Sequence, residues 1–380
     1  MERKVSALYS EYIIDGIPQG LTPARMLDSC LAGKLADEPE GPFSPVLDET
    51  LDPSLKRCEV SPDRIGEYLD GVIEMRKCSR PGPIFFPESY ARKKVAECLV
   101  EAIWRKGHFR LGNLQLQTDW KLDSSKIGNL AAFYASVSAV SEYVDSLGLR
   151  LKGYSFSEGK VNSLAVKPFV SGSSDDDDDS GPEILSDAVP APSFGTRRAH
   201  PATFRPVPSS WIIYIPFDDC DYNLGGSLLA RYLKTSGLMA PQIDDPDYFL
   251  DCYEVVRELV EDGIILSGAT VGAGGLLATL KDMAKDGTGA QVGISELMKG
   301  VGEKDAVRLL FAEVPGVVIQ IADSDYDYVD AELLLQDVAF FPLGHPDTSS
   351  AEVKVSVSDK TGLQSILESI IRSQSSEGED

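Results

Sequence analysis

Two glycine pairs in this sequence stand where chemistry could take place without a charged side chain. Gly225-Gly226 precedes Ser227 and an apolar periodic stretch, and Gly274-Gly275 opens the helix-like run "GGLLATLKDMAKDG" after a strand-like one. Bare backbone amides at the start of a helix bind phosphate oxygens. The same glycines could instead allow a helix to pack closely against a strand. Both interpretations, anion binding and close packing, stay open at this point.

Three stretches resemble nucleotide or metal motifs but have the wrong spacing. "GYSFSEGKV" (153–161) has five residues between its glycines, and valine follows its lysine, whereas a phosphate-binding P-loop needs four and then Ser or Thr. "GAGGLL" (272–277) has leucine in place of the last glycine of a dinucleotide fingerprint. "SDYDYVDAE" (324–332) lacks the central glycine of a calcium loop and is typical of a charged helix start.

Composition excludes several function classes. The formal net charge of −24 disfavours binding to nucleic acid and to anionic membrane surfaces. The apolar runs are shorter than the ~18 residues that a membrane helix needs, and no signal peptide is recognisable. The six cysteines form no CxxC pair, which favours reduced thiols and a cytoplasmic protein. Catalysis by a histidine base, or a metal site rich in histidine, is disfavoured because the chain has only His108, His200 and His345.

The elements that must position the glycine pairs follow from hydrophobic periodicity. Val95, Leu99 and Ile103 repeat every four residues and predict a helix, and Gly148 stands where a second helix would end. In the first half of the chain we expect helices at 88–107 and 128–148, with strands at 113–120, 149–156 and 162–170. The first 55 or so residues show no clear pattern.

The second half mixes strands and helices in the same way. Asp245 is placed as an N-cap, with Pro246 at the first helical position. We expect strands at 211–217, 264–268, 290–295, 317–322, 338–344 and 351–358, and helices at 225–237, 244–263, 274–287, 303–316, 328–336 and 361–372.

These patterns predict an α+β protein of two domains. The boundary between them is a stretch rich in Ser, Pro and Asp, with five consecutive aspartates, which is typical of a solvated linker. We expect an unassigned extension (1–58), an N-terminal domain (59–170), an acidic linker or inserted loop (171–207), a C-terminal domain (208–358), and a last helix with a disordered acidic tail (359–380).

Residues 247–294, "DYFLDCYEVVRELVEDGIILSGATVGAGGLLATLKDMAKDGTGAQVGI", resemble the C-terminal domain of the aminoimidazole ribonucleotide synthetase (PurM-like) superfamily. "NLGGSLLARYL" and "LLFAEVPGVVIQI" match the same domain in order and spacing, and stretches within residues 82–166 follow the N-terminal domain. Within the superfamily, the chain is most similar to the second synthetase-like half of the phosphoribosylformylglycinamidine synthases.

This resemblance implies a two-domain PurM-like architecture, whose N-terminal sheets pair edge to edge into a barrel. A homodimer, or a heterodimer with a related synthase chain, is then expected, because an exposed sheet edge needs a partner. The family binds ATP or ADP with Mg²⁺, phosphorylates an amide oxygen and lets an amine displace the phosphate. By resemblance, the nucleotide would contact the two glycine pairs and Ser227.

The hallmark of the family, Leu-Ser-Gly-His-Asp-x-Ser-Asp-Gly-Gly-Leu, is altered here. Ala269 replaces the histidine, and Thr270 and Ala273 replace the two aspartates. Magnesium prefers carboxylate oxygens, which neither replacement offers. In a second metal-binding stretch, Glu-Ala-Leu-Thr-Asn, Glu97 is kept and Glu101 replaces the asparagine. Glu97 and Glu101 are therefore the candidate metal ligands.

The family's Gly-Lys-x-Ser stretch survives with one extra residue, and its lysine corresponds to Lys160, a candidate for nucleotide binding.

Two functions of the chain remain open. The lost aspartates favour a non-catalytic structural or regulatory subunit linked to purine biosynthesis. The alternative is an ATP-dependent amide-activating ligase of the phosphoribosylformylglycinamidine synthase type, supplied with ammonia by another subunit. No catalytic residue is assigned.

Overall fold

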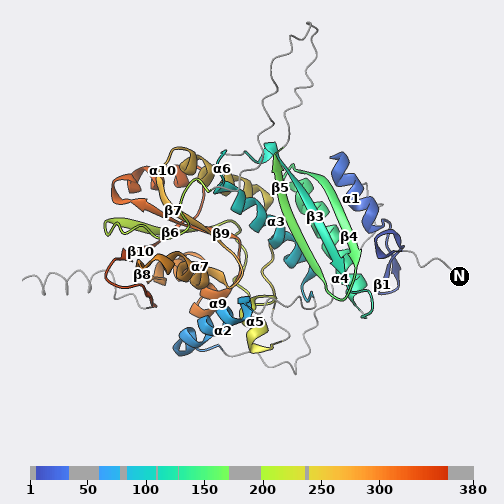
Figure 1. The fold of residues 1–380 in the computed structure, drawn as a ribbon, viewed down its shortest axis with the longest axis horizontal. Helices are drawn as coiled ribbons and strands as arrows, with labels where there is room; N and C mark the ends of the chain where they lie inside the picture. Colours follow the sequence, from blue (N-terminus) through green and yellow to red (C-terminus); the bar gives the residue numbers. More distant parts are fainter. Residues whose placement is uncertain are drawn as a thin grey trace, which may run out of the picture.

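The computed structural model describes residues 6–33, 60–77, 84–107, 110–126, 128–170, 198–235 and 239–357. The five aspartates and the helix expected at 361–372 lie outside these residues. Two lobes stand side by side, with a small sheet in one and a large sheet in the other (Figure 1). The chain is therefore α+β, as the periodicity predicts.

The first lobe is built on a three-stranded sheet in the order β4-β3-β5. Alternate residues of β3 are buried, as expected for a strand with one face covered. Helices α3 and α4 pack against each other and against this sheet. The elements are α3 (Pro87–Ile103), β3 (Leu114–Leu122), α4 (Asn129–Ser146), β4 (Arg150–Glu158) and β5 (Ser163–Val170).

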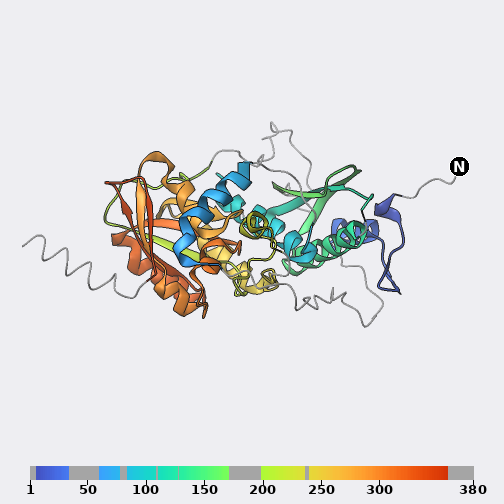
Figure 2. The same ribbon diagram turned by 90° about the horizontal axis from the view of Figure 1, so that it is seen from below.

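The N-terminal extension, which showed no clear sequence pattern, adds a helix to this lobe. Thr22 caps the helix by accepting a hydrogen bond from the amide of Arg25, and Pro23 occupies its first position. The helix packs on α4 and β4, at the end of the molecule near the N-terminus (Figure 2). The elements are β1 (Ile13–Ile14), β2 (Ile17–Pro18) and α1 (Pro23–Ala32).

The second lobe contains a six-stranded sheet in the order β11-β8-β10-β6-β9-β7. Neighbouring strands are antiparallel except β11 and β8, which are parallel. The strands are β6 (Ser210–Pro216), β7 (Ile265–Val271), β8 (Gly289–Gly293), β9 (Gly316–Ala322), β10 (Phe341–Asp347) and β11 (Val353–Ser356). Because β6 and β9 are buried on both faces, helices must cover the sheet on both sides.

Helices α6 and α3 cover one face of this sheet, and α7 and α9 cover the other. Asp245 caps α6 and Pro246 is its first residue, as predicted. Helix α9 is shorter than expected, because the chain is extended again from Ala312. The helices are α5 (Leu228–Leu233), α6 (Pro246–Glu261), α7 (Gly275–Met283), α8 (Ser295–Gly300), α9 (Ala306–Phe311) and α10 (Tyr326–Leu335). Short 3-10 turns occur at Ala7–Tyr9, Pro62–Arg64, Leu111–Asn113, Ala284–Asp286 and Asp323–Asp325.

Two segments cross between the lobes. Helix α2 (Ile65–Lys77) lies in sequence between α1 and α3 of the first lobe but packs on α5 and α7 of the second (Figure 1). Residues 198–207, expected as the end of the linker, include Arg198, which bridges to Arg105 just after α3. The same segment covers the edge of β7, where the amide of Gly268 donates to the carbonyl of Pro201 (3.0 Å). The domain boundaries themselves stay predictions.

Candidate functional site

The first glycine pair lies in the loop before α5. The amide of Gly225 donates to the carbonyl of Met239 (2.7 Å), so this donor is already used. Gly226 is exposed and has a positive φ of 75°. The hydroxyl of Ser227 accepts a hydrogen bond from the amide of Ala230 (3.2 Å) and caps α5. The amide of Gly225 and the hydroxyl of Ser227 therefore already have hydrogen-bond partners within the chain.

The second glycine pair begins α7, and its amides also have acceptors within the chain. The amide of Gly275 donates to the carbonyl of Gly272 (2.9 Å). The amide of Gly274 donates to Oε1 of Glu313 (2.8 Å), and so does the amide of Leu228 at the start of α5 (2.9 Å). One carboxylate thus accepts hydrogen bonds from amides at the start of both helices that follow the glycine pairs.

Glu313 is a buried anion that sequence analysis missed. Its exposed fraction is 5%, and its Oε2 lies 2.5 Å from Nζ of Lys93 on α3, whose exposed fraction is 9%. Burial raises the pKa of Glu313, but the charge and hydrogen bond of Lys93, with the amides of Leu228 and Gly274, outweigh it and hold the pKa below its ordinary value. Glu313 is therefore charged at neutral pH.

The sequence carries a signal for both members of this pair. Glu313 interrupts the apolar run "LLFAEVPGVVIQI". Lys93 stands three residues before Ala96 and seven before Val100, which places it on the buried face of a helix. A charged residue inside each of two apolar patterns indicates a buried pair, because an isolated buried charge is too costly.

Helix α2 covers the loop in front of α7. The guanidinium of Arg76 donates to the carbonyl of Ala273 (2.6 Å) and pairs with Asp282 (2.5 Å). A side chain at Gly274 would meet Val72 of α2 at 2.8 Å. The loop that replaces the family's metal-binding stretch is thus packed against α2.

The carboxylate of Glu101 is engaged on both oxygens. Oε1 accepts from Arg198 (2.7 Å), and Oε2 accepts from the hydroxyl of Thr270 (2.9 Å). The same hydroxyl accepts from the indole of Trp104 (2.9 Å). Arg198 also donates to the carbonyl of Gly268 (2.7 Å). Thr270, where the family has aspartate, therefore joins β7 to α3 by hydrogen bonds.

Glu97 lies one turn before Glu101 on α3. Its Oε2 pairs with Lys94 (2.7 Å), whereas its Oε1 is buried and has no hydrogen-bond partner in the described part of the chain. A side chain at Gly272 would lie 3.8 Å from this oxygen, so Glu97 faces the loop before α7. Within the residues described above, no group of three or more His, Cys, Asp or Glu side chains could hold a metal ion. The role of Glu97 and Glu101 as metal ligands stays a prediction.

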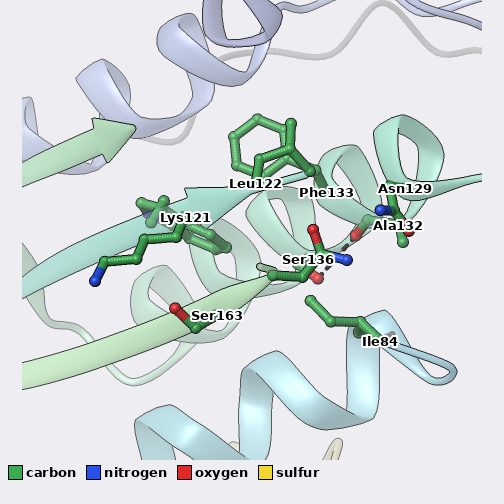
Figure 3. A pocket seen from close by; sticks show the side chains of 10 residues that line it. Ile84, Lys121, Leu122, Asn129, Ala132, Phe133, Ser136 and Ser163 are labelled. Carbon is green, nitrogen blue, oxygen red and sulfur yellow. Dashed lines mark hydrogen bonds between the residues drawn. The ribbon is translucent and has the colours of Figure 1, made fainter. Parts of the chain in front are cut away.

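Lys160 is exposed in the turn between β4 and β5, at one end of the small sheet, whereas both glycine pairs lie in loops of the second lobe. Nearby, a small recess is lined by residues of β3, β5 and α4 (Figure 3). Its cavity volume of about 10 Å³ has room for about one water molecule, and a nucleotide is far larger. In Figure 3, Ser136 points to the carbonyl of Ala132 beside Ile84.

Asp218, just after β6, gives the stability of the second lobe a dependence on pH. Burial raises its pKa to about 6, although hydrogen bonds from Cys220 and the amide of Asp245 oppose the shift; Asp244 and Asp245 add like charge. The folded protein therefore binds a proton more tightly than the unfolded chain, and charged Asp218 destabilises the fold above about pH 6.

We expect Asp218→Asn to raise the free energy of unfolding at pH 8 by up to about 2 kcal/mol, because the amide removes a buried charge. The gain should disappear near pH 4, where Asp218 itself is protonated in the folded state. Urea unfolding at the two pH values measures this, with exposed Asp219→Asn as the control. An equal effect at both pH values would contradict the assignment.

Comparison with known proteins places these residues in a family context. Residues 223–335 match the family described as "AIR synthase related protein, C-terminal domain". The range contains both glycine pairs, Thr270, Ala273 and Glu313. No helix among the described residues is long and apolar enough to cross a membrane.

Relatives extend the likeness beyond that domain. The chain is 26% identical over 282 residues to "Probable phosphoribosylformylglycinamidine synthase, chloroplastic/mitochondrial" of Arabidopsis thaliana, covering 73% of this chain and 19% of that protein. It is 25% identical over 281 residues to human phosphoribosylformylglycinamidine synthase, covering 73% of this chain and 20% of that protein. The chain spans about a fifth of the length of these relatives.

The solved structures that resemble this chain are less similar to it in sequence than these relatives are. PurLQS from Thermotoga maritima is 14% identical, with a TM-score of 0.47, over 71% of this chain and 39% of that one. PurL of the same organism complexed with ATP is also 14% identical, with a TM-score of 0.45, over 71% of this chain and 40% of that one.

Proposed function

We propose, because the chain is a PurM-like protein with an AIR synthase related C-terminal domain, that it is a non-catalytic relative of phosphoribosylformylglycinamidine synthase. It would act as a structural or regulatory subunit linked to purine biosynthesis. The observation that carries this proposal is the hydrogen bond between Thr270 and Glu101, at the positions where the family binds metal.

The chemistry around Glu101 supports this proposal. A magnesium ion escorting nucleotide phosphates needs oxygen ligands that are free to bind it. Glu101 is held by Arg198 and Thr270, and Ala273 offers no side-chain ligand. A cation at Glu101 would have to displace the guanidinium of Arg198, which already neutralises the carboxylate.

A second candidate function, the ATP-dependent amide-activating ligase, is favoured by one observation. Oε1 of Glu97 is buried and lacks a hydrogen-bond partner among the described residues, and it faces the loop before α7. Such an enzyme would take ammonia from another subunit. No group of three or more His, Cys, Asp or Glu side chains occurs among the described residues, so the other ligands of a magnesium ion at Glu97 would be water and phosphate oxygens.

We expect the protein to show no saturable binding of ATP or ADP up to about 1 mM by calorimetric titration, with or without magnesium. Losing two charge-assisted contacts, each worth about 1.5–3 kcal/mol, weakens binding by roughly a hundredfold or more. Micromolar binding of magnesium-ATP, together with phosphate release when an amide substrate and ammonia are present, would overturn the proposal in favour of the ligase.

The double variant Thr270→Asp with Ala273→Asp provides a gain-of-binding test. Its new carboxylate at position 270 would stand beside Glu101, where two negative charges repel each other unless a cation joins them. We expect magnesium to raise the melting temperature of this variant by several degrees and to leave the parent unchanged. The matched neutral variant, Thr270→Asn with Ala273→Asn, should not respond to magnesium.

The partner is part of the same proposal. Strands β4 and β5 are the edges of the three-stranded sheet within the described chain, and an exposed edge favours strand pairing. We propose a homodimer, or a heterodimer with a related synthase chain. A monodisperse monomer at micromolar concentration, by light scattering, would count against the homodimer.

A further inference from the structure

Glu313 has the ligand contacts that are usual for a bound phosphate. Three donors converge on its carboxylate: the amides of Leu228 and Gly274 on Oε1, and the ammonium of Lys93 on Oε2. Backbone amides at helix starts, combined with a lysine, form a common anion-binding arrangement. Here the anion is a side chain of the same molecule.

The three donors come from distant parts of the chain. Lys93 belongs to α3, which packs on the small sheet and also covers one face of the large sheet, whereas Leu228 begins α5 and Gly274 caps α7 in the second lobe. Glu313 itself follows α9, and its carboxylate is buried. The segments that carry Gly225-Gly226 and Gly274-Gly275, here called the glycine loops, both lead to this carboxylate. It therefore connects α3 to the second lobe.

We propose that Glu313 is a built-in anion, which occupies a phosphate-type site between α3 and the glycine loops and holds the two lobes together without a ligand. The inference deepens the proposed function and rests on it, because a site filled by the chain's own carboxylate cannot also take a nucleotide phosphate. Removing the side chain should then create a site for a small free oxyanion such as inorganic phosphate.

The test is the variant Glu313→Ala, probed with inorganic phosphate. Without its carboxylate, Lys93 and the two amides lose their partner, and the melting temperature should fall. At 50 mM phosphate we expect the melting temperature of this variant to rise by about 3 °C or more relative to chloride at equal ionic strength. The parent protein should change by less than about 1 °C under the same conditions.

Two controls separate specific rescue from a general salt effect. Glu296→Ala removes an exposed carboxylate that pairs with Lys299, so it should show no phosphate response. Glu313→Ala combined with Lys93→Met removes the cation of the site and should lose the rescue. Rescue that survives in this double variant, or no rescue in Glu313→Ala, would overturn the inference. Stabilisation of Glu313→Ala by acetate but not by phosphate would overturn it too.

If Glu313→Ala does not fold, Glu313→Gln retains the shape and an acceptor but not the charge. We then expect Lys93→Met to lower the melting temperature much less in the Gln variant than in the parent, because the charge pair is already lost. Equal effects in both backgrounds would overturn the inference. Nucleotide binding by the parent would instead refute the proposed function, so the two failures are distinguishable.

Discussion

Lys93→Met is expected to lower the free energy of unfolding by about 3–5 kcal/mol at pH 8, because it leaves the charge of Glu313 buried without its partner. The ammonium of Lys93 lies 2.5 Å from that carboxylate, and both side chains are almost fully buried. Urea unfolding followed by tryptophan fluorescence measures the loss. Lys77→Met, which breaks an exposed pair with Glu74, should cost less than about 1 kcal/mol.

The loss should depend on pH in a defined direction. In the parent, the depressed pKa of Glu313 contributes stability above its ordinary pKa, and this contribution is lost as the pH falls through the folded value. Without Lys93, burial would raise the pKa of Glu313, so protonation in mild acid should relieve part of the penalty. A deficit that is the same at pH 5 and pH 8 would show that lost packing, not charge, is responsible.

Gly275→Ala is expected to destabilise the protein by about 2–5 kcal/mol, combining strain at positive φ with a steric clash. The φ of Gly275 is 74°, and an added Cβ would lie 2.8 Å from the backbone of Leu310, Phe311 and Ala312. Because these neighbours are backbone atoms, they cannot rotate away. The midpoint of urea unfolding measures the effect.

Gly226→Ala is the matched control for that prediction. Gly226 has nearly the same φ, 75°, but its nearest neighbour is the ring of Phe86, at 3.3 Å from an added Cβ. We expect a loss of only about 1–2 kcal/mol, from the backbone strain alone. If the two variants lost the same stability, close packing would not explain the second glycine pair.

The sequence predicted the elements whose pattern is local. Helix α4 ends where Gly148 indicated, with φ of 67° at that glycine, and Asp245 caps α6. The mixed order of strands and helices predicted the α+β class. These features depend on neighbours within a few residues, and periodicity and capping chemistry report such neighbours directly.

Contacts between distant residues could not be predicted in this way. Lys93 and Glu313 are separated by 220 positions, and their pairing depends on how the two lobes meet. The position of Glu101 in a motif made it a candidate metal ligand, and this role stays a prediction. Its contacts with Arg198 and Thr270 come from distant segments, so the sequence alone did not show them. The nucleotide role of the glycine pairs, Ser227 and Lys160 stays a prediction.

The placement of α2 has a consequence for how the chain folds during synthesis. Its apolar residues Tyr68 and Val72 pack with Phe311 and other residues of the second lobe. The second lobe is therefore discontinuous in sequence, and α2 leaves the ribosome before most of its packing surface exists. At a synthesis rate of roughly 5–20 residues per second, more than about ten seconds would pass between the synthesis of α2 and that of α9. During that interval the face of α2 that carries Tyr68 and Val72 has no partner from the second lobe to bury it.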